Sequence, residues 1–142
     1  MISLKLLLIE NIRYVPGVFY HATYLPLMKS IKDNGIVPGG IKYQNYPDFD
    51  PKLGVYLAED DDLAGGLVWD ATSDKVPLGW KKKIIILSIN PKVLDLNKLE
   101  YDPNMSYTEH ESNDKGMSKS YVYKGVIPVS AIIDAKRGSY QW

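Results

Sequence analysis

The sequence predicts an α+β domain built mainly from antiparallel strands. Apolar runs and helical patterns give about six strands and two principal helices, with the helices early and most strands late in the chain. That order differs from the regular alternation of strands and helices that builds a parallel α/β sheet. The 142 residues are 45% hydrophobic and contain no evident linker or repeat. We therefore expect a single domain over residues 1–142.

The composition excludes several classes of function. The 17 basic and 17 acidic side chains cancel, so the net charge gives no strong signal for nucleic acid or for an anionic membrane. With no cysteine, the chain has no thiol nucleophile, disulfide framework or zinc–thiolate site. The apolar start is too short for a membrane span or a signal core. We expect a cytoplasmic protein with no membrane partner and no metal site.

The first third of the chain predicts two strands and a helix. Apolar runs at Leu4–Ile9 and Gly17–Thr23 are typical of strands. Thr23 is the predicted N-cap of the helix, with Pro26 in its first turn. Asn34-Gly35 supplies the C-terminal stop.

The later elements are shorter and are separated by two long loops. In chain order, the sequence predicts a loop at Ile36–Leu53, a strand at Val55–Ala58, a helix beginning at Asp60–Asp62 and a buried strand at Lys83–Ile89. A short helical turn at Asp95–Tyr101 and a loop at Asp102–Lys119 follow. The last predicted strands are Tyr121–Ile127 and Ala131–Ala135, separated by Pro128.

Few residues of the chain are candidates for chemistry. The only histidines are His21 and His110, and the glycine pairs match no phosphate-binding loop. No serine lies in the context of a strained nucleophile turn. The remaining candidates are His21 at a strand end, Tyr56 on the next short strand, and Glu109 and Glu111 in the late loop. Each of these alone has an ordinary structural explanation.

Three short motifs follow one another along the chain. A strand ends in Tyr20-His21-Ala22-Thr23 before a helix, a second strand reads Gly54-Val55-Tyr56-Leu57-Ala58, and a late strand runs into Ile127-Pro128. Over about residues 18 to 133, this order resembles the His-Tyr-Glu branch of the ADP-ribosyltransferase superfamily. That branch includes diphtheria-toxin-like and poly(ADP-ribose)-polymerase-like enzymes. The resemblance implies a compact fold of mostly antiparallel, split β-sheets with a few helices.

The resemblance also implies a site for NAD, which would be a substrate. His21 and Thr23 would hold ribose hydroxyls, and the main chain of Ala22 would pair with the nicotinamide carboxamide. Tyr56 would stack on the nicotinamide ring, and Tyr43 is included among the NAD-binding residues. The implied activity is transfer of one ADP-ribose unit to an unknown macromolecular acceptor, most simply a protein. A small transferase of this kind would suit a toxin or a host-targeting effector.

The sequence departs from the family at the catalytic glutamate. The family places this residue at the beginning of the late strand, where this chain has Lys119 and Ser120. Glu109 and Glu111 in the preceding loop are therefore the candidate carboxylates. Either would stabilise the oxocarbenium-like transition state and orient the incoming nucleophile.

Two alternative functions remain at this point. A domain of the same fold without catalysis would bind a nucleotide or a protein, through its cleft or through the aromatic loop around Tyr43. A related branch, the RNA 2′-phosphotransferases, uses a histidine and arginines with no essential glutamate. Only Arg13 and Arg137 are present, with Lys81–Lys83 as a candidate phosphate contact. A domain whose motifs match by chance would have no cleft joining His21 and Tyr56.

Overall fold

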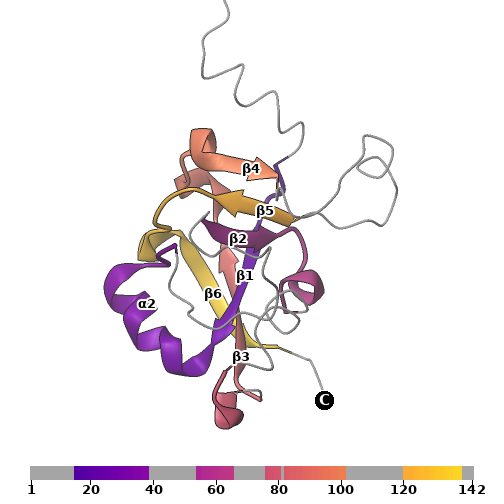
Figure 1. The fold of residues 1–142 in the computed structure, drawn as a ribbon. Coiled ribbons are helices and arrows are strands. Elements are labelled where there is room, and N and C mark those ends of the chain that lie inside the picture. Colours follow the sequence, from indigo (N-terminus) through magenta and orange to yellow (C-terminus); the bar gives the residue numbers. More distant parts are fainter. Residues whose placement is uncertain (1–14, 39–53, 66–75, 81, 102–119, 139–142) are drawn as a thin grey trace, which may run out of the picture.

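The computed structural model describes residues 15–38, 54–65, 76–80, 82–101 and 120–138. Within these ranges the chain forms one six-stranded sheet in which every pairing is antiparallel (Figure 1). The strands are β1 (Phe19–Tyr24), β2 (Val55–Ala58), β3 (Ile84–Ile89), β4 (Leu99–Tyr101), β5 (Ser120–Tyr123) and β6 (Ile132–Arg137). Their order across the sheet is β4-β5-β2-β1-β3-β6. The predicted α+β class is confirmed.

The helical segments are short. Among the described residues, the longest helical run is α2 (Met28–Asn34), which follows the 3-10 turn η1 (Leu25–Leu27). Residues 61–65 are also helical. The other 3-10 turns are η3 (Leu78–Trp80), η4 (Pro91–Val93), η5 (Leu96–Lys98) and η6 (Val129–Ala131).

The sheet changes direction sharply between β2 and β1. In Figure 1, β4, β5 and β2 run across the view, whereas β1, β3 and β6 run steeply down it. β1 pairs with β3 over six positions, but it pairs with β2 at one position only, Tyr20↔Ala58. The sheet therefore consists of two three-stranded halves. We call the junction between β1 and β2 beyond Tyr20↔Ala58 the seam.

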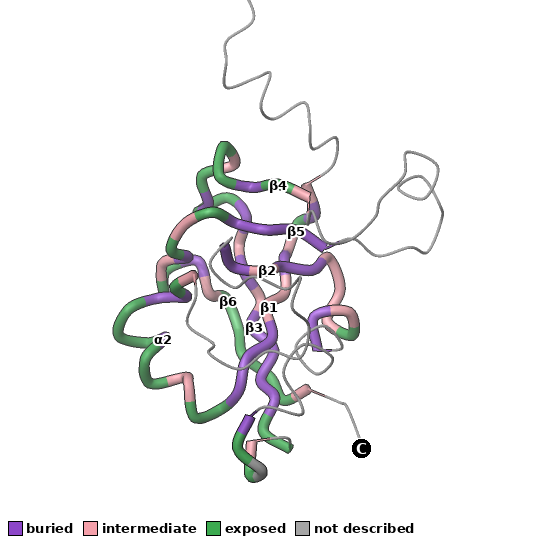
Figure 2. The backbone as a smooth tube through the Cα atoms, viewed as in Figure 1, coloured by how far each residue is buried: buried purple, intermediate pink, exposed green. Residues whose placement is uncertain are grey.

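The two faces of the sheet carry separate apolar clusters. On one face Phe19, Leu57 and Leu87 pack with Ile31 of α2, and we call this the α2 face. On the opposite face Ala22, Tyr24, Ala58 and Ile86 pack with Ala64 of the helical residues 61–65. Strands β1, β2, β3 and β5 are mostly buried, whereas β6 and the outer side of α2 are exposed (Figure 2). Both faces of the sheet therefore carry packed apolar side chains.

The first helix confirms the predicted stop and corrects the predicted start. Gly35 ends α2 with φ +76°, a conformation that favours glycine, and Pro26 lies in the first turn of η1 as expected. The N-cap prediction for Thr23 is wrong. Thr23 is a buried strand residue paired with Ile85, and η1 begins after Tyr24 without a side-chain cap. Strand pairing outweighs the local capping preference of threonine here.

The later strands lie where the sequence predicts them, but some of them differ from the prediction in length. β2 spans the predicted residues, and β3 lies between two strands with both faces in use, as expected. The late strand ends at Tyr123, because the chain turns and Ile127 forms an isolated bridge with Ile36. The predicted helical turn at Asp95–Tyr101 agrees with η5 but is wrong for its last three residues, which form β4, since so short a strand carries no readable alternation. Leu4–Ile9, residues 39–53 and residues 102–119 lie outside the described residues.

Substituting Gly54 should destabilise the fold, because β2 approaches β5 closely at this glycine. A Cβ at Gly54 would overlap the Tyr123 carbonyl oxygen and lie 2.6 Å from Val122 Cγ1. We expect Gly54→Ala to lower the free energy of unfolding by about 1–3 kcal/mol, measured by urea denaturation. Gly17→Ala is the control, since its Cβ would meet nothing within 4 Å. Equal stability of the two variants would contradict the close approach.

Candidate functional site

His21 links the two halves of the sheet. It lies in the middle of β1 opposite Leu87, which places its half-buried side chain on the α2 face. Its Nδ1 atom is 2.8 Å from the main-chain oxygen of Tyr56 on β2. A carbonyl oxygen only accepts hydrogen bonds, so Nδ1 carries the proton and donates it to Tyr56. The hydrogen bond fixes both the orientation and the tautomer of the ring.

The second nitrogen of His21 is a hydrogen-bond acceptor. Burial lowers the pKa of His21 below its ordinary value of 6.5, and the hydrogen bond to Tyr56 opposes this shift without cancelling it. The ring is therefore neutral at pH 7, with the proton on Nδ1 and a lone pair on Nε2. Within the described residues, no group donates a hydrogen bond to Nε2. This nitrogen is suited to accept a hydrogen bond from a ligand hydroxyl.

The main chain of Ala22 faces the seam. In an antiparallel strand, successive residues direct their N–H and C=O groups alternately to the two neighbouring strands. Leu25 N donates to Lys83 O at 2.7 Å, so the odd-numbered residues of β1 face β3. The even-numbered residues therefore face β2. Tyr20 pairs with Ala58 there, but the ladder does not continue to Ala22.

The seam thus presents a donor and an acceptor from one residue. In a regular ladder, the Tyr56 carbonyl would accept a hydrogen bond from the main chain of β1. Here it accepts one from the His21 ring instead. Ala22 N–H and C=O lie beside it on the same strand edge. An adjacent N–H and C=O together are complementary to a primary amide, which has one group of each kind. The expected pairing of Ala22 with a carboxamide is therefore compatible with the strand geometry.

Thr23 lies on the same face as His21. The two residues are separated by one position of β1, and Thr23 pairs with Ile85 of the α2-face cluster. Its side chain is only 2% exposed, and it forms no hydrogen bond with the part of the chain that the structure describes. A buried hydroxyl of this kind usually has a partner. His21 and Thr23 therefore form a polar pair beside the apolar α2-face cluster.

The side chain of Tyr56 leaves the sheet on the other face. Tyr56 lies between Val55 and Leu57, which both belong to the α2-face cluster, and it pairs with Val122. Strand alternation therefore directs its half-buried ring to the opposite face. The structure brings Tyr56 and His21 together through the Tyr56 main chain, and the two side chains flank the seam from its two sides.

The beginning of β5 lies next to the end of β2. Ser120 pairs with Ala58 and is fully buried. The strand start at which the family would place a glutamate is therefore next to the strand that carries Tyr56. Glu109 and Glu111 lie outside the described residues, as does Tyr43.

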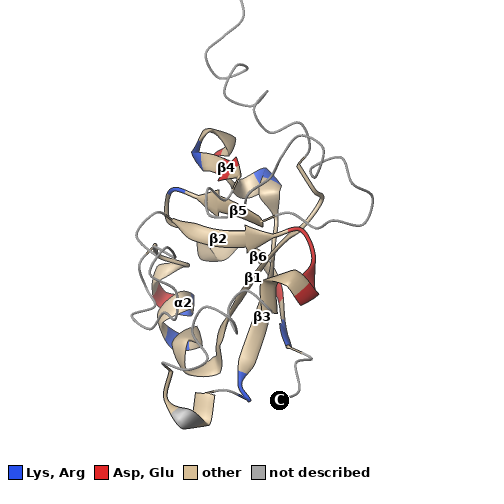
Figure 3. Ribbon diagram, turned by 45° about the vertical axis from the view of Figure 1, so that its right-hand side comes forward, with Lys and Arg blue, Asp and Glu red and all other residues tan. Residues whose placement is uncertain are grey.

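The sequence reasoning missed Glu59. This residue follows β2 directly, and Figure 3 shows the acidic run that it opens at the end of that strand. The hydroxyl of Tyr121 donates a hydrogen bond to Glu59 Oε2 at 3.4 Å. The adjacent Asp60 caps the following helical residues, because its Oδ1 accepts from Leu63 N at 2.6 Å. Glu59 was hidden in the sequence because the run reads as one helix start.

Other kinds of site receive no support from the described ranges. These ranges hold no group of three or more potential metal ligands. They also contain no helix long and apolar enough to cross a membrane.

No protein-family model matches this sequence, and no curated protein sequence is significantly similar to it.

The stability of the protein should depend on pH through His21. Because its pKa is lowered on folding, the unfolded chain binds more protons below about pH 6.5, and the free energy of unfolding falls as the pH falls. We expect His21→Asn, which keeps a donor for Tyr56 but does not titrate, to lose less stability than the wild type from about pH 7.5 to about pH 5.5. Denaturation at each pH measures this difference.

His110→Gln is the matched control, because it removes the other histidine of the chain and leaves His21 in place. Equal pH dependence in the wild type and His21→Asn would contradict the lowered pKa.

Proposed function

We propose that the chain is an NAD-dependent mono-ADP-ribosyltransferase, which cleaves the nicotinamide glycosidic bond and transfers ADP-ribose to an unknown acceptor. The observation that carries this proposal is the seam between β1 and β2. There the His21 ring bonds the Tyr56 carbonyl, and the Ala22 main chain faces β2 beyond the last paired position.

Nicotinamide would bind at the seam through its carboxamide. The amide N–H₂ would donate to Ala22 C=O, and the amide oxygen would accept from Ala22 N–H. The side chain of Tyr56 projects from the face of the sheet opposite the α2 face. There its ring would stack on the pyridine ring of nicotinamide. A flat amide-bearing ring therefore satisfies both the main-chain edge and the aromatic side chain.

The ribose hydroxyls would bind on the α2 face. His21 Nε2 would accept a hydrogen bond from one hydroxyl, since Nδ1 already holds the ring proton. The buried Thr23 hydroxyl lies on the same face and would support this contact. A neutral acceptor and a hydroxyl recognise a diol by direction rather than by charge.

The site also requires a carboxylate, which would stabilise the cationic ribose as the bond breaks. Sequence reasoning named Glu109 and Glu111 for this role. The acceptor would be a macromolecule, most simply a protein, and the cytoplasm is the compartment proposed. A toxin or host-targeting effector would use such an activity.

The second candidate function is a domain of this kind without catalysis, which binds a nucleotide or a protein. Ser120 favours it, because the strand start carries a fully buried serine in place of a carboxylate. An RNA 2′-phosphotransferase has less support. Arg137 lies on the edge strand β6, two strands away from β1, and Lys82 and Lys83 are exposed at the entrance to β3.

Nicotinamide release from NAD should depend on His21. We expect purified protein to release nicotinamide, measured by chromatography, and His21→Ala to reduce the rate on the order of a hundredfold. His21→Asn should also lose most activity while keeping wild-type stability near neutral pH, because it retains a donor for Tyr56 but lacks Nε2. Traces from the wild type and His21→Ala that both match buffer would exclude the enzyme. Retained NAD binding would then favour the non-catalytic domain.

The Tyr56 side chain should contribute through its ring and not through its hydroxyl. We expect Tyr56→Ala to raise the KM for NAD roughly tenfold or more, since stacking on an aromatic base is worth about 1–3 kcal/mol. Tyr56→Phe should stay within about twofold of the wild type, because it preserves the stacking surface. Steady-state kinetics measure both variants. A loss in Tyr56→Phe as large as that in Tyr56→Ala, or an unchanged KM in Tyr56→Ala, would contradict a stacking role.

A further inference from the structure

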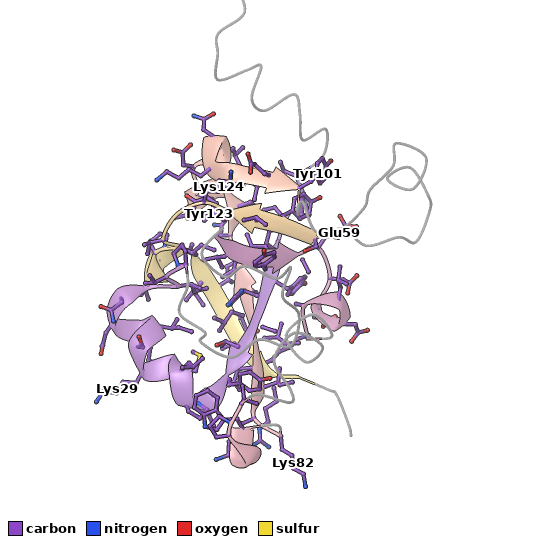
Figure 4. All side chains as sticks on the ribbon, viewed as in Figure 1. Lys29, Glu59, Lys82, Tyr101, Tyr123 and Lys124 are labelled. Atoms are coloured by element: carbon purple, nitrogen blue, oxygen red, sulfur yellow. The ribbon has the colours of Figure 1, made fainter. Side chains whose placement is uncertain are left out.

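Glu59 lies beside the strand start at which the proposed function lacks a carboxylate. It follows Ala58 at the end of β2, and Ala58 pairs with Ser120, the first residue of β5. Figure 4 labels Glu59 and Tyr101 at one end of the β4-β5-β2 half, and Tyr123 and Lys124 at the other end. Glu59 therefore offers a carboxylate from the neighbouring strand.

Glu59 belongs to the face that carries His21. Val55 and Leu57 belong to the α2-face cluster, and Glu59 is the next odd-numbered position of the same run. The hydrogen bond from Tyr121 supports this placement, because Tyr121 pairs with Leu57 and belongs to the same cluster. The carboxylate and His21 thus lie on the same face of two neighbouring strands.

Aromatic packing fixes the group that holds Glu59. Tyr121 is fully buried, with its ring centroid 5.0 Å from that of Phe19 in an edge-on contact and 5.3 Å from that of Tyr101 in a stacked contact. Phe19 lies on β1 two positions before His21. A rigid phenol that donates to Oε2 restricts the carboxylate rotamer and leaves its other oxygen available for a further contact.

The acidic neighbours of Glu59 have other roles. Asp60 caps the helical residues 61–65, and Asp61 forms an ion pair with Lys136 of β6. Glu59 forms no ion pair with any residue in the described ranges. It is half-buried, and the Tyr121 hydroxyl donates a hydrogen bond to it. A half-buried carboxylate without an ion-pair partner among the described residues is suited to stabilise a positive charge on a ligand.

We infer that Glu59 is the catalytic carboxylate of the proposed ADP-ribosyl transfer, taking the role that the sequence had assigned to Glu109 or Glu111. This inference rests on the proposed function. Glu59 contacts the ribose of bound NAD on the α2 face, and Tyr121 is a positioning residue that holds it. The site is then assembled from β1, β2 and β5, with the carboxylate directly after β2.

The chemical step balances without a further reactant. The bond between ribose C1′ and the nicotinamide nitrogen breaks, and its electron pair leaves on nicotinamide, which becomes neutral. Glu59 stabilises the positive charge that develops on the ribose. A nucleophilic oxygen or nitrogen of the acceptor then bonds to C1′, and its proton passes to solvent through the carboxylate. With water as acceptor, the products are ADP-ribose, nicotinamide and one proton.

The test compares four glutamine variants: Glu59→Gln, Glu109→Gln, Glu111→Gln and Glu100→Gln. Nicotinamide release is measured by chromatography and NAD affinity by calorimetry. We expect Glu59→Gln to lower kcat on the order of a hundredfold while NAD still binds with near wild-type affinity. Glu100→Gln is the matched control, because Glu100 is an exposed β4 residue paired with Lys124. It should keep full activity.

Tyr121→Phe tests the positioning role separately. It retains the packed ring and loses the hydroxyl, so we expect a lower kcat with an unchanged melting temperature and a smaller loss than in Glu59→Gln. Because removing the carboxylate removes the group that Tyr121 positions, the double variant should be no slower than Glu59→Gln alone.

The outcomes separate this inference from the proposed function. An active wild type in which Glu59→Gln keeps its kcat overturns the role of Glu59 alone, and a loss confined to Glu109→Gln or Glu111→Gln moves the carboxylate to the late loop. A wild type that binds NAD without releasing nicotinamide overturns both proposals in favour of a binding domain. A wild type that does not bind NAD overturns both.

Discussion

The hydrogen bond from His21 to the Tyr56 carbonyl is the contact on which the candidate site depends. A regular ladder between β1 and β2 would satisfy that carbonyl with a main-chain N–H, and the strand edge would then be closed. The imidazole takes this place, so the two halves of the sheet are held together by a side chain where main-chain pairing stops at Tyr20↔Ala58. The same bond sets the tautomer and leaves Nε2 as an acceptor, while strand alternation directs the Ala22 main chain toward the gap. One interaction thus determines the connection between the halves and the hydrogen-bonding pattern that they expose.

The fold was predictable where a local signal and the tertiary environment agree. The sequence indicated three elements: the strand Val55–Ala58, the glycine stop at Gly35 and the buried strand Ile84–Ile89. At these places alternation, turn chemistry and burial favour the same structure. Thr23 shows the opposite case. Its capping preference is a local property of about 1 kcal/mol, which six paired positions between β1 and β3 outweigh. The three-residue β4 exists only because β5 lies beside it, and no local pattern in so short a segment could indicate this.

The sequence predicted that some residues of the candidate site group together, but it did not predict their geometry. Residue order placed His21, Ala22, Thr23 and Tyr56 in one group, and the structure puts them on adjoining strands. That the His21 and Tyr56 side chains leave on opposite faces follows from register, which depends on pairing between segments more than thirty residues apart. Glu59 was overlooked for a related reason. Its neighbours Asp60, Asp61 and Asp62 all read as a helix start, and only the hydrogen bond to Tyr121, a partner 62 positions away, distinguishes it from them.

The lowered pKa of His21 has a consequence for where such a site can operate. Protonating Nε2 would convert an acceptor into a donor and reverse the kind of ligand group that the ring can bind. Because burial disfavours the charged ring, the folded protein keeps Nε2 as an acceptor in mildly acidic surroundings where a solvent-exposed histidine would already carry two protons. The ligand-binding character of the ring is thus insulated from a moderate fall in pH, at the expense of the conformational stability of the chain. As the pH falls below about 6.5, the free energy of unfolding therefore falls before the ring changes what it can bind.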